Sequence, residues 1–507
     1  MAVSASTIKF VNQWLSEGAL KLHFTCYEYF ESIEFISYRD RCPYLSYPTG
    51  STFVVWLLAK MAGRVHIGIS FLKHIQAVFF GVETVTVALF VYLFLSQIKF
   101  QKEFEKVFLS VVVAITWAYM PGNAWYLANV LFADQLIILY ILLFILLEYI
   151  NDTSDNISTN KVVRILKVGI IYFGIMTDYY FWIFIFLIFL FKIGRFIVQR
   201  KKIKQMVRGT FEYAIPVIMG VATFIWQISY TEGWIDILKD KFIYRTRGEV
   251  SGSLFESFCK MYVCNEQFRG WVLLAGGLGF VAAVIIALTR EKSISRIFVE
   301  PGISVIIVSI VAPIIQVLFL RNHSINHEFS MVKMAWIIAL FPVFYVAFTQ
   351  WETQTNHNNS MLRNGQGISI TCMRTIFLIM LLGYVMKMPF ATEEYLEKNE
   401  WKENYEMEEA LSNIADYDDV CFSFDTQILY DDSMRLAISE KCIYQINDVV
   451  EIEEKISKIN GKVDKIYFII DKLAEDTNLK HEYFKTKIMK TKDCIYEDGK
   501  YCIVSLE

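Results

Sequence analysis

The sequence lacks several features that would point to common classes of protein. None of its 9 cysteines forms a CxxC motif, so nothing indicates a zinc or redox site of that type. The formal net charge is only -3, which gives no support for nucleic-acid binding. Residues 1–40 contain no continuous apolar run, so we expect no cleavable signal peptide. No internal repeat and no low-complexity segment is present.

Hydrophobic residues, by contrast, are abundant. They make up 55% of the 507 residues, and the mean hydropathy is +0.38. Runs of about 18 or more apolar residues can cross the hydrocarbon core of a bilayer, and the backbone must then be helical to satisfy its own hydrogen bonds. We therefore expect an α-helical polytopic membrane protein with about ten spans. The expected spans are 67–97, 106–120, 124–149, 165–179, 180–198, 211–230, 271–289, 302–320, 331–349 and 373–389, and the shorter piece 51–62 is expected to be re-entrant or interfacial.

The distribution of Lys and Arg predicts how these helices are oriented. Cytoplasmic loops carry an excess of basic residues. Four basic groups all fall on one side of the proposed helices: Lys99, Lys102 and Lys106; Lys161, Arg164 and Lys167; residues 192–208, beginning with Lys192 and Arg195; and Arg290, Lys292 and Arg296. We expect that side to be the cytoplasm, with the protein in the plasma membrane. Residues 1–66, 231–270, 321–330 and the tail from 390 then lie outside.

The chain divides into three predicted regions: a first extracytoplasmic loop (1–50), a transmembrane domain (51–390) and a more charged tail (391–507). Four short apolar runs in the tail, DVCFSF, CIYQI, KIYFII and YCIVSL, predict strands, with Glu497-Asp498-Gly499 as a hairpin turn between the last two. DVVEIEEKISKIN predicts an amphipathic helix ended by Gly461. The tail is therefore expected to be a small extracytoplasmic α/β domain.

Several polar or aromatic residues near the expected outer ends of the helices are candidate site residues. Tyr44 to Gly50 forms a polar and aromatic mouth, although taken alone it is explained better by an interfacial aromatic belt and a Pro-initiated helix. Asp134 lies about three turns inside the predicted helix 124–149, where a carboxylate should face the bundle or water rather than lipid. Asp178 lies at the turn between two helices, as a site residue or as a helix N-cap.

Two outer segments carry further candidates. RNHSINHEFSMVKMAW places His323, His327 and Glu328 at a helix entrance, and the two histidines would share a helical face. They suit a polar pocket better than a metal site, because the Glu of the H-E-x-x-H motif is missing. WIDILKDKFIYRTRGEV predicts an interfacial amphipathic helix whose Arg245 and Arg247 could bind a lipid-linked phosphate or anionic headgroups.

These pieces in this order resemble the integral-membrane GT-C glycosyltransferases, in the branch of protein mannosyltransferases and aminoarabinose transferases. NQWLSEGALKLHF is similar to the family's first outer loop, and YLSYPTGSTFVVWLLAKMAG to its Tyr-Pro-Pro stretch, with Thr49 in place of the second Pro. HIGISFLKHIQAVFFGVETVTVALFVYLF resembles the next helix, in which Lys73, with His74 beside it, takes the position of a basic residue. YMPGNAWYLANVLFADQLIILY resembles the helix that bears an acidic residue, here Asp134.

The sequence departs from the family pattern at its N-terminus. The family has a first membrane helix followed at once by an acidic catalytic base, whereas residue 1 already falls in the region that resembles the first outer loop. The resemblance therefore leaves three interpretations: a start further upstream, an inactive copy, or another carboxylate as base. Asp134 and the outer-loop residues Glu28, Glu31, Glu34 and Asp40 are the candidate carboxylates.

The resemblance implies transfer of a sugar from a polyprenyl-phosphate-linked donor to a glycan, lipid or protein acceptor outside the membrane. Candidate catalytic residues are Asp134, Asp40 and Glu28, and candidate substrate-binding residues are Tyr47, Lys73, His74, Asp178, Arg245, Arg247, His323, His327 and Glu328. A divalent metal cofactor stays open. The alternative is a non-catalytic membrane subunit that binds lipid-linked glycan during assembly of a surface polymer. A secondary transporter is a weaker reading, because paired broken helices and repeat halves are missing.

Overall fold

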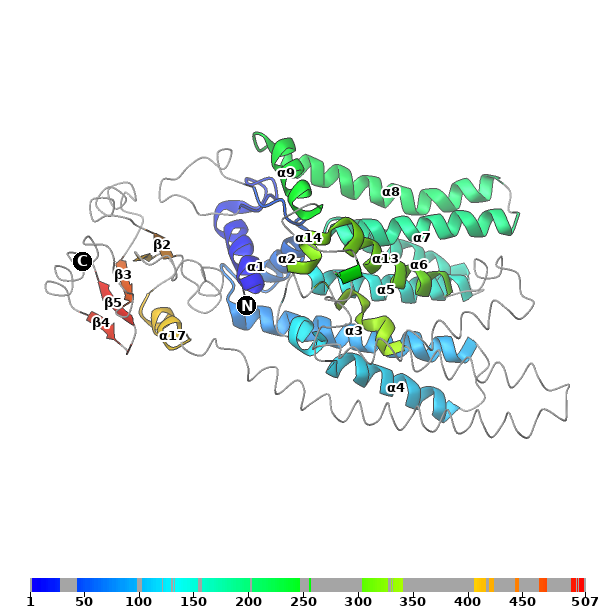
Figure 1. Cartoon of the computed structure of the whole chain (residues 1–507), viewed down its shortest axis with the longest axis horizontal. Coiled ribbons are helices and arrows are strands. Elements are labelled where there is room, and N and C mark those ends of the chain that lie inside the picture. The colour runs from blue at the N-terminus through cyan, green and yellow to red at the C-terminus, as the bar shows by residue number, and fades with distance from the viewer. Residues whose placement is uncertain are drawn as a thin grey trace.

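A computed structural model shows a helical bundle and a separate small sheet (Figure 1). The structure describes residues 2–27, 43–97, 103–120, 122–128, 131, 133–153, 157–200, 203–246, 255–256, 303–326, 330, 332–340, 405–415, 419–423, 443–445, 465–471, 494–497, 499 and 501–505. The sheet lies beyond the end of the bundle at which the N-terminus is found (Figure 1).

Long apolar helices form the bundle. They are α3 (Ile69–Gln97), α4 (Glu103–Tyr119), α5 (Ala133–Thr153), α6 (Ile157–Ile175), α7 (Tyr179–Val198), α8 (Ile203–Ile228) and α13 (Ile303–Phe319), followed by a helix over 332–340. Within the described residues, stretches of α3, α5, α7 and α8 are long and apolar enough to cross a membrane. The expected class of α-helical membrane protein with a small C-terminal sheet is confirmed.

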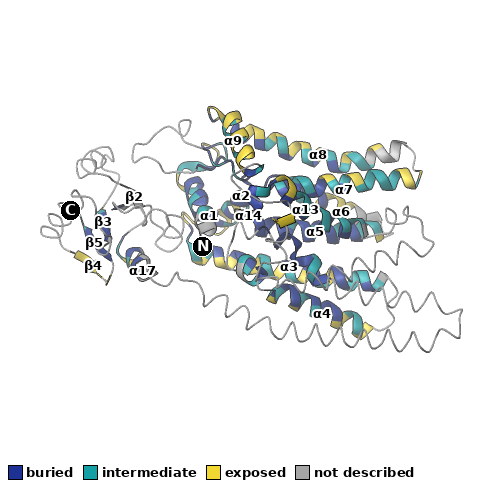
Figure 2. Cartoon of the chain, viewed as in Figure 1, coloured by how far each residue is buried: buried dark blue, intermediate teal, exposed yellow. Residues whose placement is uncertain are grey.

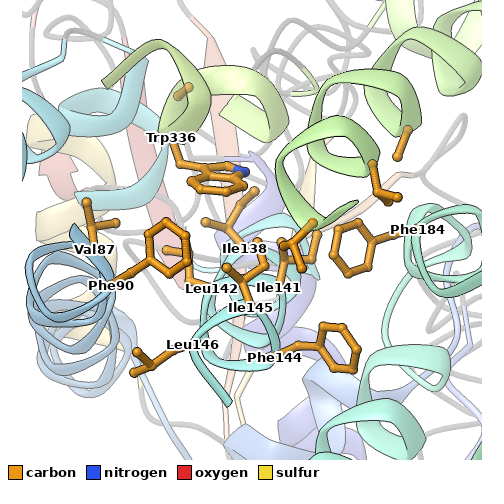
Figure 3. Packing of buried hydrophobic residues seen from close by; sticks show 14 of the residues in the cluster. Val87, Phe90, Ile138, Ile141, Leu142, Phe144, Ile145, Leu146, Phe184 and Trp336 are labelled. Carbon is orange, nitrogen blue, oxygen red and sulfur yellow. The ribbon is translucent and has the colours of Figure 1, made fainter. Parts of the chain in front are cut away.

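Helix α5 occupies the centre of the bundle. Its most apolar stretch is 78% buried, whereas the corresponding stretches of α3, α7 and α8 are 22–33% buried and leave apolar side chains outside (Figure 2). Ile138, Leu142 and Ile145 of α5 pack with Phe90 of α3 and Trp336 of the 332–340 helix (Figure 3). Phe90 and Trp336 meet edge to face, with ring centroids 6.1 Å apart. The packing holds the ends of α5, α7 and the 332–340 helix in fixed relation.

Shorter elements cover one end of this bundle. They are α1 (Ala2–Gln13), the π-helix η1 (Trp14–Gly18), α2 (Gly50–Met61), α9 (Trp234–Thr246) and α14 (Arg321–Asn326). The Asn12 side chain donates to the Ile67 carbonyl at 3.0 Å and accepts from the Ile67 amide at 2.8 Å, which ties α1 to the start of α3. The short piece expected at 51–62 and the amphipathic helix expected after Trp234 are α2 and α9.

Gly50 brings the mouth against the turn between α6 and α7. Its amide donates to the Met176 carbonyl at 2.5 Å. A Cβ at this position would lie 2.5 Å from that oxygen and 2.6 Å from Thr177 Oγ1. Only glycine allows so close an approach. The mouth is therefore packed directly beside the turn that carries Asp178.

Two expectations for the helices are wrong in detail. The segment expected as one helix over 124–149 contains a π-helix, η3 (Asn123–Leu127), and α5 begins only at Ala133, so Asp134 lies in a first turn and not deep inside a helix. Lys167, Lys192 and Arg195, expected in loops, lie within α6 and α7. Acidic side chains of neighbouring helices neutralise them there, which lets the helices extend past them. The expected spans 271–289 and 373–389 lie outside the described residues.

The C-terminal sheet is mixed, in the order β2-β1-β3-β5-β4. Its strands are β1 (Val420–Ser423), β2 (Ile443–Gln445), β3 (Ile466–Asp471), β4 (Cys494–Glu497) and β5 (Tyr501–Ser505). The first three are parallel, whereas β5 is antiparallel to both β3 and β4. Met407 and Leu411 of α17 (Tyr405–Ile414) cover one face, packing on Tyr467 and Ile503. This is the expected α/β arrangement.

One strand of the tail escaped sequence analysis. The turn residue Gly499 lies between β4 and β5, so the hairpin joins β5 to β4 and not to β3. The four-residue CIYE strand is too short to register as a period-2 pattern. The helix expected over DVVEIEEKISKIN lies outside the described residues.

Candidate functional site

A buried lysine between two carboxylates forms the centre of the candidate site. Lys333, in the 332–340 helix, has a fully buried side chain. Its Nζ lies 2.9 Å from Asp134 Oδ1, in the first turn of α5, and 3.1 Å from Asp178 Oδ2, just before α7. It also lies 4.9 Å from the centre of the Tyr180 ring. We call Lys333, Asp134 and Asp178 the Lys333 cluster.

The two aspartates of the cluster are bound differently. Asp178 is the N-cap of α7, and its Oδ1 accepts from the Tyr180 amide at 2.8 Å, while its Oδ2 pairs with Lys333. Both of its oxygens are thus engaged, and its predicted capping role is confirmed. Asp134 forms an ion pair with Lys333 through Oδ1, and neither of its two buried oxygens makes a hydrogen bond within the described residues. Asp134 therefore retains an acceptor atom for a ligand.

A tyrosine, a histidine and an arginine adjoin the Lys333 cluster. Tyr47 Oη lies 3.1 Å from His323 Nε2 of α14. The guanidinium carbon of Arg245, near the end of α9, lies 5.0 Å from the centre of the Tyr47 ring. Tyr47 also packs against Ala133, the residue before Asp134. The mouth, α5, α7, α9, α14 and the 332–340 helix therefore meet at this end of the bundle.

The ionisation of Tyr47 reports the charges around it. Burial raises the pKa of its hydroxyl well above the ordinary value, and the negative charges of Asp134 and Asp178 raise it further, against a smaller lowering by Arg245. Tyr47 therefore stays protonated at neutral pH and can donate or accept a hydrogen bond.

An apolar cavity of about 860 Å³ opens beside this group. Aromatic and aliphatic side chains of α7, α8, α9 and α13 line it, among them Trp182, Phe186, Phe224, Leu238 and Phe319. Its charged lining consists of Lys239, Lys241 and Arg245, all from α9. Arg245 and Tyr179 line the cavity and also contact each other, with the guanidinium 5.5 Å from the ring centre. Arg245 thus joins the cavity to the Lys333 cluster.

The structure brings together five of the residues predicted from the sequence: Tyr47, Asp134, Asp178, Arg245 and His323. Lys73 and His74 are not among them, because both are exposed on α3, where His74 Nδ1 lies 2.7 Å from the Ser70 carbonyl oxygen. Glu28, Asp40, Arg247, His327 and Glu328 lie outside the described residues. Within the described residues, no group of three or more His, Cys, Asp or Glu side chains could hold a metal ion.

Lys333 was not among the residues predicted from the sequence. A signal was present, because a lysine among the apolar residues of SMVKMAWIIAL is costly in lipid and must find an anionic partner inside the bundle. The partners themselves cannot be read from the sequence, since they are separated from Lys333 by more than 150 positions along the chain.

Comparison with known proteins supports the fold. No family model matches the chain, and no curated protein matches it. Among solved structures, ArnT from Cupriavidus metallidurans bound to undecaprenyl phosphate superposes with a TM-score of 0.56. The match covers 99% of this chain and 93% of that one, at 8% sequence identity. This chain therefore has the fold of ArnT, as its resemblance to the GT-C glycosyltransferases predicted.

Proposed function

We propose that this protein is a glycosyltransferase that moves a sugar from a polyprenyl-phosphate-linked donor to a cell-envelope acceptor on the outer side of the plasma membrane. One juxtaposition carries the proposal. A large apolar cavity with cationic side chains on its lining is connected, through Arg245 and Tyr47, to a buried carboxylate that has an unused oxygen. The cavity suits a lipid tail, the cationic side chains suit its phosphate, and the carboxylate suits the hydroxyl group of an acceptor.

The cavity is suited to the donor. A polyprenyl chain is long and apolar, and the aromatic walls contributed by α7, α8 and α13 would remove it from water. Arg245, with Lys239 and Lys241 further along α9, would neutralise the phosphate. Arginine binds phosphate oxygens through two parallel hydrogen bonds, so Arg245 is the best suited of the three. ArnT, which has the same fold, was crystallised with undecaprenyl phosphate, and this supports the assignment.

Asp134 is suited to the acceptor. In the proposed reaction the acceptor hydroxyl oxygen attacks the anomeric carbon of the sugar while the bond from that carbon to the phosphate oxygen breaks. The hydroxyl proton passes to Asp134 Oδ2, which no described residue occupies. Polyprenyl phosphate leaves with the bonding electrons, and Arg245 stabilises its charge. Tyr47 and His323 would orient the reacting groups by hydrogen bonds.

Deletion of the gene in its native host tests this function. We expect one polyprenyl-phosphate-linked sugar to accumulate in the membranes, and the mass of that lipid identifies the sugar. Mass spectrometry of extracted lipids measures it, and re-expression of the chain should return it to the original level. Unchanged levels of every polyprenyl-phosphate-linked sugar would contradict the proposal. Binding of polyprenyl phosphate without any such accumulation would support the non-catalytic subunit instead.

A further inference from the structure

The ammonium group of Lys333 is directed at other groups of the protein and not at the cavity. A lysine has three N–H donors. Lys333 directs its charge to Asp134 at 2.9 Å and to Asp178 at 3.1 Å, and it lies over the Tyr180 ring at 4.9 Å. Its side chain is fully buried. Lys333 therefore differs from Arg245, which lines the cavity and can meet a phosphate directly.

The contacts form an ordered chain from the backbone to Asp134. The amide of Tyr180 fixes Asp178 through the helix cap, and Asp178 fixes Lys333. Lys333 in turn is the ion-pair partner of Asp134. Asp134 is thereby held by one oxygen, and its other oxygen is left without a partner among the described residues. A carboxylate held in this way presents one acceptor atom in a defined direction.

We propose that Lys333 and Asp178 are positioning residues that hold the Asp134 carboxylate in its charged form with Oδ2 presented to the acceptor hydroxyl. This inference rests on the proposed transferase function. An unpaired carboxylate in so buried a place would take up a proton and could no longer accept one. Among the described residues, the other charged or titratable groups that face Asp134 are Tyr47 from the mouth and Arg245 from α9, and His323 contacts Tyr47 from α14. Lys333 is nearest and is the cation with which Asp134 forms its ion pair.

The experiment measures sugar transfer against pH for the full chain in liposomes, with the lipid-linked sugar identified above as donor. Lys333→Met should slow transfer at neutral pH by about tenfold or more. It should also move the acid limb of the pH–rate profile upwards by about one pH unit or more, because the carboxylate has lost the adjacent cation. The KM for the lipid donor should stay unchanged. Lys333→Arg, which keeps the positive charge, should restore the position of the acid limb.

A second variant separates positioning from folding. Lys333→Met leaves two buried carboxylates without their ion-pair partner, which destabilises the folded protein. Lys333→Met combined with Asp178→Asn removes one of those charges, and the amide oxygen of Asn can still cap α7. If Lys333 positions Asp134, this folded double variant keeps the slow rate and the shifted acid limb. A wild-type rate and profile in the double variant would overturn the inference.

Failure of this inference can be told from failure of the proposed function. If the wild-type chain transfers sugar and the folded variants match it at every pH, only the role of Lys333 and Asp178 is refuted. If the wild-type chain transfers no sugar at any pH, the transferase function fails, and the positioning role falls with it.

Discussion

The two buried ion clusters at opposite ends of α5 differ in what they leave unsatisfied. Asp134 and Glu148 are about 21 Å apart along the helix, at about 1.5 Å per residue. The second group, which we call the Glu148 cluster, comprises Glu148, Asp152, Lys167, Lys192, Arg195, Glu212 and Tyr213. It joins α5, α6, α7 and α8.

Charges in the Glu148 cluster are matched. Glu148 Oε2 lies 2.6 Å from Lys167 Nζ and accepts from Tyr213 Oη at 2.8 Å, while its other oxygen pairs with Lys192. Lys167 also pairs with Glu212 at 3.0 Å. Each oxygen of Glu148 therefore faces a lysine, although Oε1 makes no hydrogen bond within the described residues, whereas Asp134 has one lysine partner, at Oδ1. In the Lys333 cluster a single lysine serves two carboxylates, and one oxygen stays open.

This difference teaches how to interpret buried charge in a membrane protein. Ionisable residues inside a bilayer suggest a functional site by default, and that rule selects both clusters. Only the Lys333 cluster also combines an unpartnered acceptor with a neighbouring cation that lines an apolar cavity. We therefore propose a catalytic role for the Lys333 cluster and a structural role for the Glu148 cluster, which links α5, α6, α7 and α8.

The largest expected effect separates the two carboxylates directly. Asp134→Asn should lower the rate of sugar transfer by about 10²–10⁴-fold, the usual contribution of a general base. The protein should still fold, because Lys333 keeps Asp178 as a partner. Transfer assays at matched protein amounts in liposomes measure this. Full activity of Asp134→Asn would end the assignment of the base.

Glu148→Gln is the matched control and should show the reverse pattern. It leaves Lys167 and Lys192 without their shared carboxylate, so stability should fall by about 3–5 kcal/mol. The transfer rate per folded molecule should stay at the wild-type value. Thermal unfolding in detergent gives the first quantity and active-site-normalised assays the second. A large loss of rate without loss of stability would show that the chemistry belongs to the Glu148 cluster and not to the Lys333 cluster.

Arg245 tests whether the cavity binds a phosphate. Arg245→Gln should weaken binding of polyprenyl phosphate by about tenfold or more, since a hydrogen bond to a charged group contributes about 1.5–3 kcal/mol. Native mass spectrometry of the full chain, titrated with undecaprenyl phosphate, measures the affinity. Arg164→Gln is the control, because Arg164 is half exposed near Glu212 in the other cluster. Equal weakening by both variants would indicate a general charge effect.

Gly50 tests how tightly the mouth must fit. Gly50→Ala places a methyl group 2.5 Å from the Met176 carbonyl, which should cost about 1–3 kcal/mol and displace Tyr47 from His323. Gly81→Ala is the control, since a Cβ there meets nothing within 4 Å. The unfolding temperatures of the two variants, compared in the same detergent, measure the difference. Equal temperatures would show that the mouth is not packed as described.

Hydropathy predicted the architecture well, because each membrane helix must be apolar along its own length. The division between α6 and α7 at Asp178 and the presence of helix α9 followed from local pattern alone. The start of α5 did not follow from local pattern, because NAWYLANVLFAD contains no Pro, Gly or change of hydropathy that would separate η3 from α5. Individual site residues were predicted only where a polar side chain interrupted or adjoined an apolar segment. Lys333 and the balanced partners of Lys167 depend on pairings between distant helices, which no local pattern contains.

Lys73 gives the smallest expected effect and tests the limit of the family resemblance. The resemblance put Lys73 in the position of a basic site residue, yet its side chain is exposed on α3, whereas Arg245 is 8% exposed and adjoins Tyr47. Lys73→Gln should therefore change the transfer rate by less than about twofold, because surface substitutions outside a packed or charged site have small effects. The same liposome assay measures it beside Arg245→Gln. A loss for Lys73→Gln as large as that for Arg245→Gln would mean that the phosphate reaches α3, and the cation of the site would then have to be reassigned.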